Sequence, residues 1–174
     1  MADFDRAVNK LLRLEGGFSP VDVSAQVGAV NWGITQRFLR SIGHPASVED
    51  VRSLSRAQAK GLYKKYFWDP LRLSEIKSQR IAETILFAAV NIGPATAVRI
   101  LQRSLRAIDR MVAVDGILGP RTIGAINSLG DEMFDGFLFV YKEKLKTKYE
   151  SLARSRPELY GRYLNGWLKR LEST

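Results

Sequence analysis

The apolar residues of this chain recur at three- and four-residue spacing along nearly its whole length, and this periodicity constrains the fold more than any other feature. Residues with that spacing lie on one face of an α-helix, so each segment is expected to pack that face against a common core. Glycines, prolines and polar turns separate the predicted helices, which span about residues 4–15, 34–42, 55–68, 80–91, 94–106, 120–128, 131–155 and 158–171. The sequence therefore predicts a mostly α fold.

Residues 18–31 are the region that interrupts the helical period. They begin with the turn-forming stretch Phe18-Ser19-Pro20 and continue with alternating valines, which predicts a small β-hairpin or an extended loop. No linker, low-complexity tract or repeat divides the chain. Its 174 residues, with 45% apolar content, are enough for one sizeable core, so we expect a single domain spanning 1–174.

The cysteine and histidine content excludes several kinds of site. The chain has no cysteine and a single histidine, His44, which lies in a predicted surface turn. A disulfide framework and metal sites built from cysteines or clustered histidines are therefore excluded, and a Ser-His triad is disfavoured. We expect neither a metal nor a cofactor.

The charge balance indicates a polyanionic partner. The chain has 27 Lys and Arg against 18 Asp and Glu, a net charge of +9, which suits nucleic acid, an anionic membrane surface or a bacterial wall. Residues 140–174 alone hold nine basic residues and four glutamates. These helices present either a solvated face or a surface for anionic outer-membrane lipid. Because the sequence lacks a recognition-helix motif and an aromatic-basic stacking pattern, we do not expect it to bind nucleic acid.

The N-terminal stretch MADFDRAVNK is acidic and amphipathic, whereas a signal peptide is basic and then apolar. The chain also lacks a run of about 18 apolar residues of the kind that spans a bilayer. We therefore expect neither a signal peptide nor a membrane span, and synthesis in the cytoplasm.

Glu15 has the wrong charge for its position. It follows the apolar face of the first predicted helix and precedes Gly16 and Gly17, and the carbonyl groups at a helix C-terminus favour a cation there. One interpretation is a general acid, whose pKa is raised mainly by burial against apolar walls. The other is a structural ion pair with Arg13, Arg37 or another cation.

Five fragments, taken in order, resemble glycoside hydrolase family 108, the N-acetylmuramidases of phages and bacteria: LEGGF, NWGITQ, YFWDP, AVNIGP and VDGILGPRT. The resemblance implies a lysozyme-like α fold, with Glu15 as the catalytic acid. It also implies cleavage of the β-1,4 bond between N-acetylmuramic acid and N-acetylglucosamine in bacterial peptidoglycan. For an endolysin-like protein of this kind we expect a monomer that acts in the periplasm after holin-dependent release.

The stretch from Leu101 to Leu129 resembles a peptidoglycan-binding helical repeat. Too few residues precede it for a comfortable independent muramidase core. We therefore interpret residues 1–92 as a catalytic lobe and residues 93–174 as a peptidoglycan-binding-like helical lobe, packed as one unit.

A second catalytic carboxylate is harder to assign. An inverting glycosidase places its base about 6.5 to 9.5 Å from the acid, and a retaining enzyme places its nucleophile at about 5 to 5.5 Å. Asp22 is the candidate in the loop that follows Glu15, although an aspartate beside a proline turn also serves as a local cap. Ala25, Val30 and Phe87 stand where family members commonly have Asp, Thr and Asp. Hydrolysis with Asp22 as base, transglycosylation by Glu15 alone, and a weakened wall-binding protein therefore all remain open.

The resemblance also implies that Asn31, Trp32, Gly33 and Asn91 line the cleft. Trp32 has a face for stacking on a sugar, and Asn91 offers both a donor and an acceptor to an N-acetyl group. The alternatives are a core tryptophan and an asparagine that ends a helix. Thr35 either replaces the hydroxyl missing at residue 30 or caps the next helix.

Overall fold

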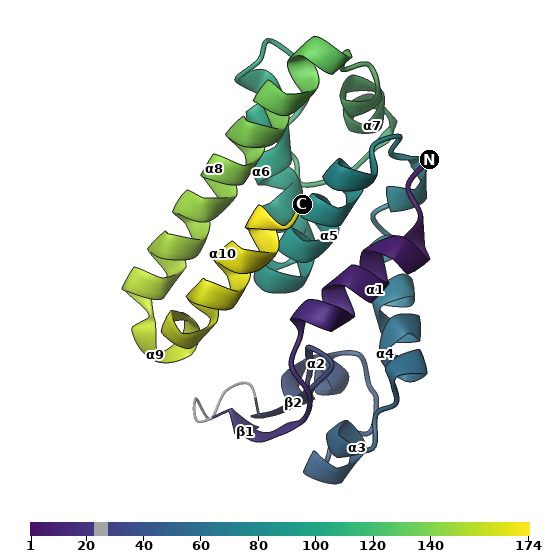
Figure 1. Ribbon diagram of the computed structural model, residues 1–174, viewed down its shortest axis with the longest axis vertical. Helices are drawn as coiled ribbons and strands as arrows, with labels where there is room; N and C mark the ends of the chain where they lie inside the picture. The colour runs from purple at the N-terminus through teal and green to yellow at the C-terminus, as the bar shows by residue number, and fades with distance from the viewer. Residues whose placement is uncertain (23–27) are drawn as a thin grey trace.

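The computed structural model describes the backbone of residues 1–22 and 28–174, and the side chains of the same ranges except residues 21 and 22. It shows a mostly α fold with one small antiparallel sheet, as the sequence predicts (Figure 1). The principal elements are α1 (Phe4–Leu14), β1 (Ser19–Asp22), β2 (Gly28–Asn31), β3 (Ile34–Thr35), α2 (Gln36–Ser41), α3 (Val48–Arg52), α4 (Arg56–Tyr63), α5 (Gln79–Ile92), α6 (Pro94–Arg106), α7 (Pro120–Asn127), α8 (Asp131–Ser155), α9 (Pro157–Tyr160) and α10 (Leu164–Glu172).

Helix α5 forms the centre of the molecule. Its residues 81–89 are all buried, which is the burial expected of a helix enclosed on every side. Helices α1, α6, α8 and α10 pack around it. Phe87 belongs to this core and is 2% exposed.

The last helix of the chain packs against the first. Helices α1 and α10 are in contact, and both contact α5. The Lys10 ammonium group donates to the Ser173 carbonyl oxygen and pairs at 2.8 Å with the buried Glu83 carboxylate of α5. This packing brings α10 close to the end of α1, where Glu15 lies. In the described ranges, no helix is both long enough and apolar enough to cross a bilayer.

The sheet lies with α2 and α3 at one end of the molecule, near the end of α1 (Figure 1). Its strands follow the order β1-β2-β3, and Val30 pairs with Thr35 across the second hairpin. The two turn residues between β2 and β3, Trp32 and Gly33, both have positive φ, as in the tight turns that suit twisted hairpins. The predicted hairpin is therefore confirmed, and β3 extends it into residues that the periodicity assigned to a helix.

Three further segments differ from the predicted helices. The helix expected over 55–68 is α-helical at Arg56–Tyr63 and continues as a π-helix at Lys64–Trp68. The single helix expected over 158–171 is divided into α9, a 3-10 turn at Gly161–Tyr163, and α10. Glycine has a low helix propensity, and packing of Tyr160 and Tyr163 on Trp167 sets the local conformation. The five-residue helix α3 was not predicted from periodicity, because it is shorter than two turns. Its sequence signal is local, a capping box at Ser47.

Candidate functional site

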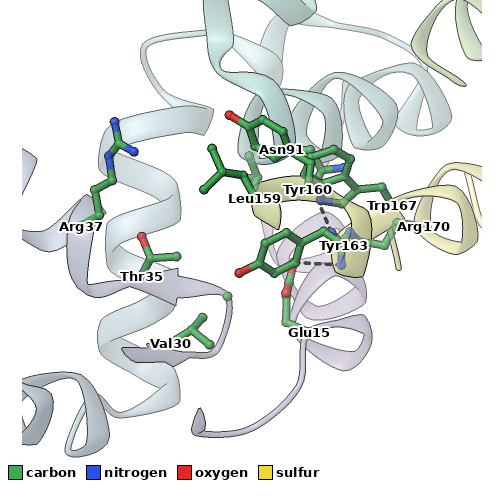
Figure 2. A pocket seen from close by; sticks show the side chains of 12 residues that line it. Glu15, Val30, Thr35, Arg37, Asn91, Leu159, Tyr160, Tyr163, Trp167 and Arg170 are labelled. Atoms are coloured by element: carbon green, nitrogen blue, oxygen red, sulfur yellow. Dashed lines mark hydrogen bonds and ion pairs between the residues drawn. The ribbon is translucent and has the colours of Figure 1, made fainter. Parts of the chain in front are cut away.

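Glu15 is the residue at which the chain leaves helix α1. It is the C-cap, with its backbone N–H donating to the Leu11 carbonyl oxygen at 3.0 Å and its own backbone extended. Its side chain is 15% exposed, and that exposed part faces a pocket of about 200 Å³ (Figure 2). The apolar face of α1 therefore ends in a largely buried carboxyl group at the wall of a cavity.

The pocket has two walls that come from separate parts of the chain. The first is built by the end of α1 and by the sheet with the start of α2, and the second by the end of α5 and the last helices. The described residues that line it are Glu15, Val30, Gly33, Thr35, Arg37, Val90, Asn91, Leu159, Tyr160, Tyr163, Trp167 and Arg170. Figure 2 shows the aromatic side chains entering from the second wall, opposite Val30 and Thr35.

Arg170 of α10 is the ion-pair partner of Glu15. Its Nη1 lies 3.2 Å from Glu15 Oε1, and the two side chains are 9% and 15% exposed. Arg170 Nη2 donates to Asn91 Oδ1 at 2.9 Å, and Asn91 Nδ2 donates to the Tyr149 hydroxyl at 3.3 Å. Glu15 therefore forms an ion pair, as the second interpretation of the sequence allowed, and its partner is a cation from the far end of the chain.

Burial and the ion pair act on Glu15 in opposite directions. Burial raises the pKa of the Glu15 carboxyl, whereas the Arg170 guanidinium lowers it without cancelling the effect of burial. Desolvation favours the neutral form of a carboxyl group, and a neighbouring cation favours the ionised form. The net rise in pKa leaves a larger protonated fraction near neutral pH than an exposed glutamate would have. A proton donor requires this property.

Gly33 allows the close approach of the turn to Glu15. A Cβ atom on Gly33 would lie 2.7 Å from Glu15 Cδ and 2.5 Å from the Tyr63 hydroxyl, and the φ of Gly33 is +75°. The Tyr63 hydroxyl donates to the Trp32 carbonyl oxygen at 3.0 Å. Burial, assisted by the charge of Glu15, raises the pKa of Tyr63 well above its ordinary value, so Tyr63 stays a neutral donor. The turn, the phenol and the carboxyl group therefore form one close-packed unit.

Asn31 and Trp32 lie behind the pocket, since neither is among its described lining residues. The side-chain amide of Asn31, which is 5% exposed, donates to the carbonyl oxygens of Val51, Arg52 and Leu54. The Trp32 indole N–H donates to the Leu54 carbonyl oxygen at 2.9 Å. Both side chains therefore tie the loop before α4 to the sheet. The Asn31 amide nitrogen and the Trp32 indole nitrogen are thus engaged within the protein, and the contact of these two side chains with a sugar stays a prediction.

Gly33, Thr35 and Asn91 do line the pocket. Thr35 Oγ1 accepts a hydrogen bond from the Phe38 backbone N–H at 3.0 Å and caps α2, so the hydroxyl is both a helix cap and part of the pocket wall. The Asn91 amide lies at the pocket but is engaged by Arg170 and Tyr149. Its first role in this structure is to hold the guanidinium.

The Asp22 backbone ends β1 and pairs with Gly28, while the Asp22 side chain and Ala25 lie outside the described residues. The distance between the two predicted catalytic carboxylates therefore stays a prediction. Within the described part of the chain, no three Asp, Glu or His side chains gather as a metal site would require.

Sequence reasoning predicted Asn91 of the second wall but missed the part of that wall built by α9, α10 and the turn between them. The rings of Tyr163 and Trp167 stack with centroids 6.1 Å apart and an interplanar angle of 15°, and Tyr160 packs on Trp167 at 5.7 Å. The available signal was the spacing of Tyr160, Tyr163, Trp167 and Arg170, which puts three aromatic residues and a cation on one helical face. That spacing is more typical of a core helix, and it does not show which part of the molecule the face contacts.

Comparisons with known proteins agree with this arrangement. Residues 8–93 match the family model of glycosyl hydrolase 108, and residues 96–172 match that of a predicted peptidoglycan domain. The structure of Brucella abortus SagA is similar in fold, with a TM-score of 0.74 and 20% sequence identity, over 98% of this chain and 94% of that one. A search of curated proteins gives no match.

Proposed function

The chain belongs to the glycosyl hydrolase 108 family through residues 8–93 and continues into a predicted peptidoglycan domain, and from this premise we propose that it is an N-acetylmuramidase. Both matches support a glycosidase that acts on peptidoglycan. The finer proposal concerns the bond and the acid. Glu15 protonates the β-1,4 glycosidic oxygen between N-acetylmuramic acid and N-acetylglucosamine.

One observation carries this proposal: a largely buried carboxyl group with a raised pKa lies in the wall of a pocket. As the bond between the sugar C1 and the glycosidic oxygen breaks, the Glu15 proton moves to the departing oxygen. A water molecule adds to C1 and gives up a proton to the base, for which Asp22 is the candidate. This scheme corresponds to inversion, and it requires the Asp22 carboxylate to approach the pocket from the sheet.

A lytic transglycosylase is the second candidate. Glu15 is the sole carboxylate among the described residues that line the pocket. Acting alone, Glu15 would first donate its proton to the leaving oxygen and then remove the proton of the muramic C6 hydroxyl. Attack of that hydroxyl oxygen on C1 closes a 1,6-anhydro ring, so no second carboxylate is needed.

Product analysis distinguishes these functions. Purified sacculi are incubated with the protein, and the new ends are identified by mass spectrometry. Reducing N-acetylmuramic acid supports the muramidase, and 1,6-anhydro ends support the transglycosylase. Reducing N-acetylglucosamine ends would contradict both assignments of the bond. Retention on sacculi without any product would indicate a weakened wall-binding protein.

We further propose that the two matched regions act as a single unit. The predicted peptidoglycan domain supplies most of the second wall of the pocket, including the cation beside Glu15, while Val90 and Asn91 of that wall lie in the glycosyl hydrolase 108 region. A chain ending before α8 would therefore lose part of its site as well as affinity for the wall. When residues 1–92 are expressed separately, we expect no activity, and we expect that adding residues 93–174 does not restore it.

A further inference from the structure

Arg170 is an unusual neighbour for a residue that must hold a proton. A guanidinium beside a carboxyl group favours the ionised form, which is the wrong form for a proton donor. Its own burial is also costly, because a charge removed from water needs close partners. Arg170 has such partners at Nη1 and Nη2, while its Nε is buried without a hydrogen-bond partner in the described part of the chain.

The guanidinium is held from a different helix than the carboxyl group. Asn91 of α5 accepts from Arg170 Nη2, and Tyr149 of α8 fixes the Asn91 amide by accepting from its Nδ2. Burial raises the pKa of Tyr149 to about 12, so this phenol stays neutral. Three helices thus fix the guanidinium against Glu15 Oε1, and Figure 2 shows the contacts of Arg170 with Asn91 and Glu15 as dashed lines.

We propose that Arg170 is a positioning residue for the reaction, which orients the Glu15 carboxyl group toward the pocket and stabilises the carboxylate that proton transfer leaves behind. This inference rests on the proposed function. When the O–H bond of Glu15 breaks, the proton goes to the glycosidic oxygen and the electron pair stays on the carboxylate. The negative charge thus develops 3.2 Å from a guanidinium that is already in place. An interaction that strengthens as charge develops lowers the barrier, whereas one of constant strength does not.

Other charged or titratable groups also face Glu15. Tyr63 of α4 packs against it, Arg37 of α2 lines the same pocket, and Tyr163 lines it from the second wall. Tyr63 is neutral, as described above. Among the described residues, Arg170 is the cation within ion-pair distance of Glu15. Removal of its charge should therefore let burial act unopposed and raise the pKa of Glu15 further.

The test compares pH profiles of Arg170→Met, Arg170→Lys and wild type on solubilised peptidoglycan. A general acid works while protonated, so activity falls as pH rises through the pKa of Glu15. In Arg170→Met this limb should move to higher pH, because the pKa rises, while the maximal kcat falls roughly 10- to 100-fold and KM changes little. Arg170→Lys retains the charge and should keep the limb near that of wild type. Lys169→Met, which removes an exposed cation from the same helix, is the matched control.

An activity-independent readout separates this inference from the proposed function. The carboxyl carbon of Glu15 is titrated by ¹³C NMR in wild type, Arg170→Met and Arg170→Lys. If wild type cleaves peptidoglycan but Arg170→Met leaves the titration and the pH limb unmoved, the inference fails and the function stands. If the titration moves as expected but wild type produces no new sugar ends, the function fails and takes the catalytic role of Arg170 with it. Should Arg170→Met not fold, Arg170→Gln and Asn91→Leu carry the same comparison, and an unmoved titration in both overturns the inference.

Discussion

The two walls of the pocket are built in different ways. The first wall depends on local backbone geometry: the end of α1 and a tight turn put Glu15 and Gly33 in contact within 18 residues of chain. The second wall depends on tertiary packing, since Arg170 reaches Glu15 only after α5, α8 and α10 have assembled. In the proposed reaction, the first wall provides the proton donor, and the second sets the surroundings in which it works. Substitution of Glu15 in the first wall should therefore affect the chemistry most. In the second wall, substitution of the aromatic residues should affect binding, and substitution of Arg170 should affect the ionisation of Glu15 and, through it, the rate.

The largest effect is expected from Glu15→Gln. The amide is close to the carboxyl group in size but has no acidic proton, so the rate should fall by at least about 100-fold, at the scale of general acid catalysis. Clearance of a sacculus suspension measures the rate, and circular dichroism checks the fold. Glu49→Gln is the control, because the Glu49 side chain is 72% exposed on α3. Clearance by Glu15→Gln at a rate close to that of wild type would contradict the proposal that Glu15 is the proton donor.

Gly33→Ala should have the next largest effect. The new methyl group would meet the Glu15 carboxyl carbon and the Tyr63 hydroxyl in a backbone with positive φ. We expect the free energy of unfolding to fall by about 1 to 3 kcal/mol. Because Glu15 must also move, the activity should fall roughly 10- to 100-fold.

Gly43→Ala is a matched control for this substitution. Gly43 has a φ of +72°, but a Cβ atom there meets nothing within 4 Å. The control should therefore show the backbone cost alone and keep its activity. Denaturant unfolding and turbidity assays on both variants make the comparison. Equal activity of the two would mean that the contact of Gly33 with Glu15 has no catalytic consequence.

Tyr163→Ala tests the second wall and should have a smaller effect. The ring enters the pocket opposite Thr35 (Figure 2) and is backed by Trp167. Loss of an aromatic contact with a sugar should raise KM about 3- to 10-fold with little change in kcat. Steady-state kinetics on soluble peptidoglycan fragments measure both constants. Tyr66→Ala, at another partly buried tyrosine that packs on Phe38, is the reference. A fall in kcat with unchanged KM would mean that Tyr163 acts in the chemical step and not in substrate binding.

The sequence predicts those parts of the fold that local rules determine. Helices α6 and α8 begin and end where the periodicity, Pro94 and the flanking glycines place them. The last helices differ because contacts with Trp167 outweigh helical periodicity. Propensity and period act over a few residues, and a tertiary contact overrides them without a local signal.

The same distinction applies to the site. Glu15 is recognisable because its charge conflicts with its place at a helix end, whereas the tight turn at Trp32 and Gly33 was not predicted. Arg170 is not recognisable, because nothing in the sequence around either residue encodes a contact across 155 positions. Asn31 and Trp32 were assigned to the cleft by family position, and their hydrogen bonds to the loop before α4 become visible only in three dimensions.

The smallest effect, and the one that most directly compares the two walls, is the pH dependence of stability. Burial raises the folded-state pKa of Glu15 above its value in the unfolded chain. The folded state therefore binds the proton more tightly, and the contribution of Glu15 to stability is fully present below the unfolded pKa. That contribution is lost as pH rises through the folded pKa. The difference in free energy of unfolding between wild type and Glu15→Gln should accordingly decrease from acidic to neutral pH.

Urea unfolding of both chains over this pH range measures the difference. In the Arg170→Met background the pKa of Glu15 is higher still, so the loss of stability should extend to higher pH than in the wild-type background. A difference that instead increases with pH would mean that Glu15 is more acidic in the folded state than in the unfolded one. The guanidinium of the second wall would then dominate over burial at the first, and Glu15 would be held as a carboxylate rather than as a proton donor.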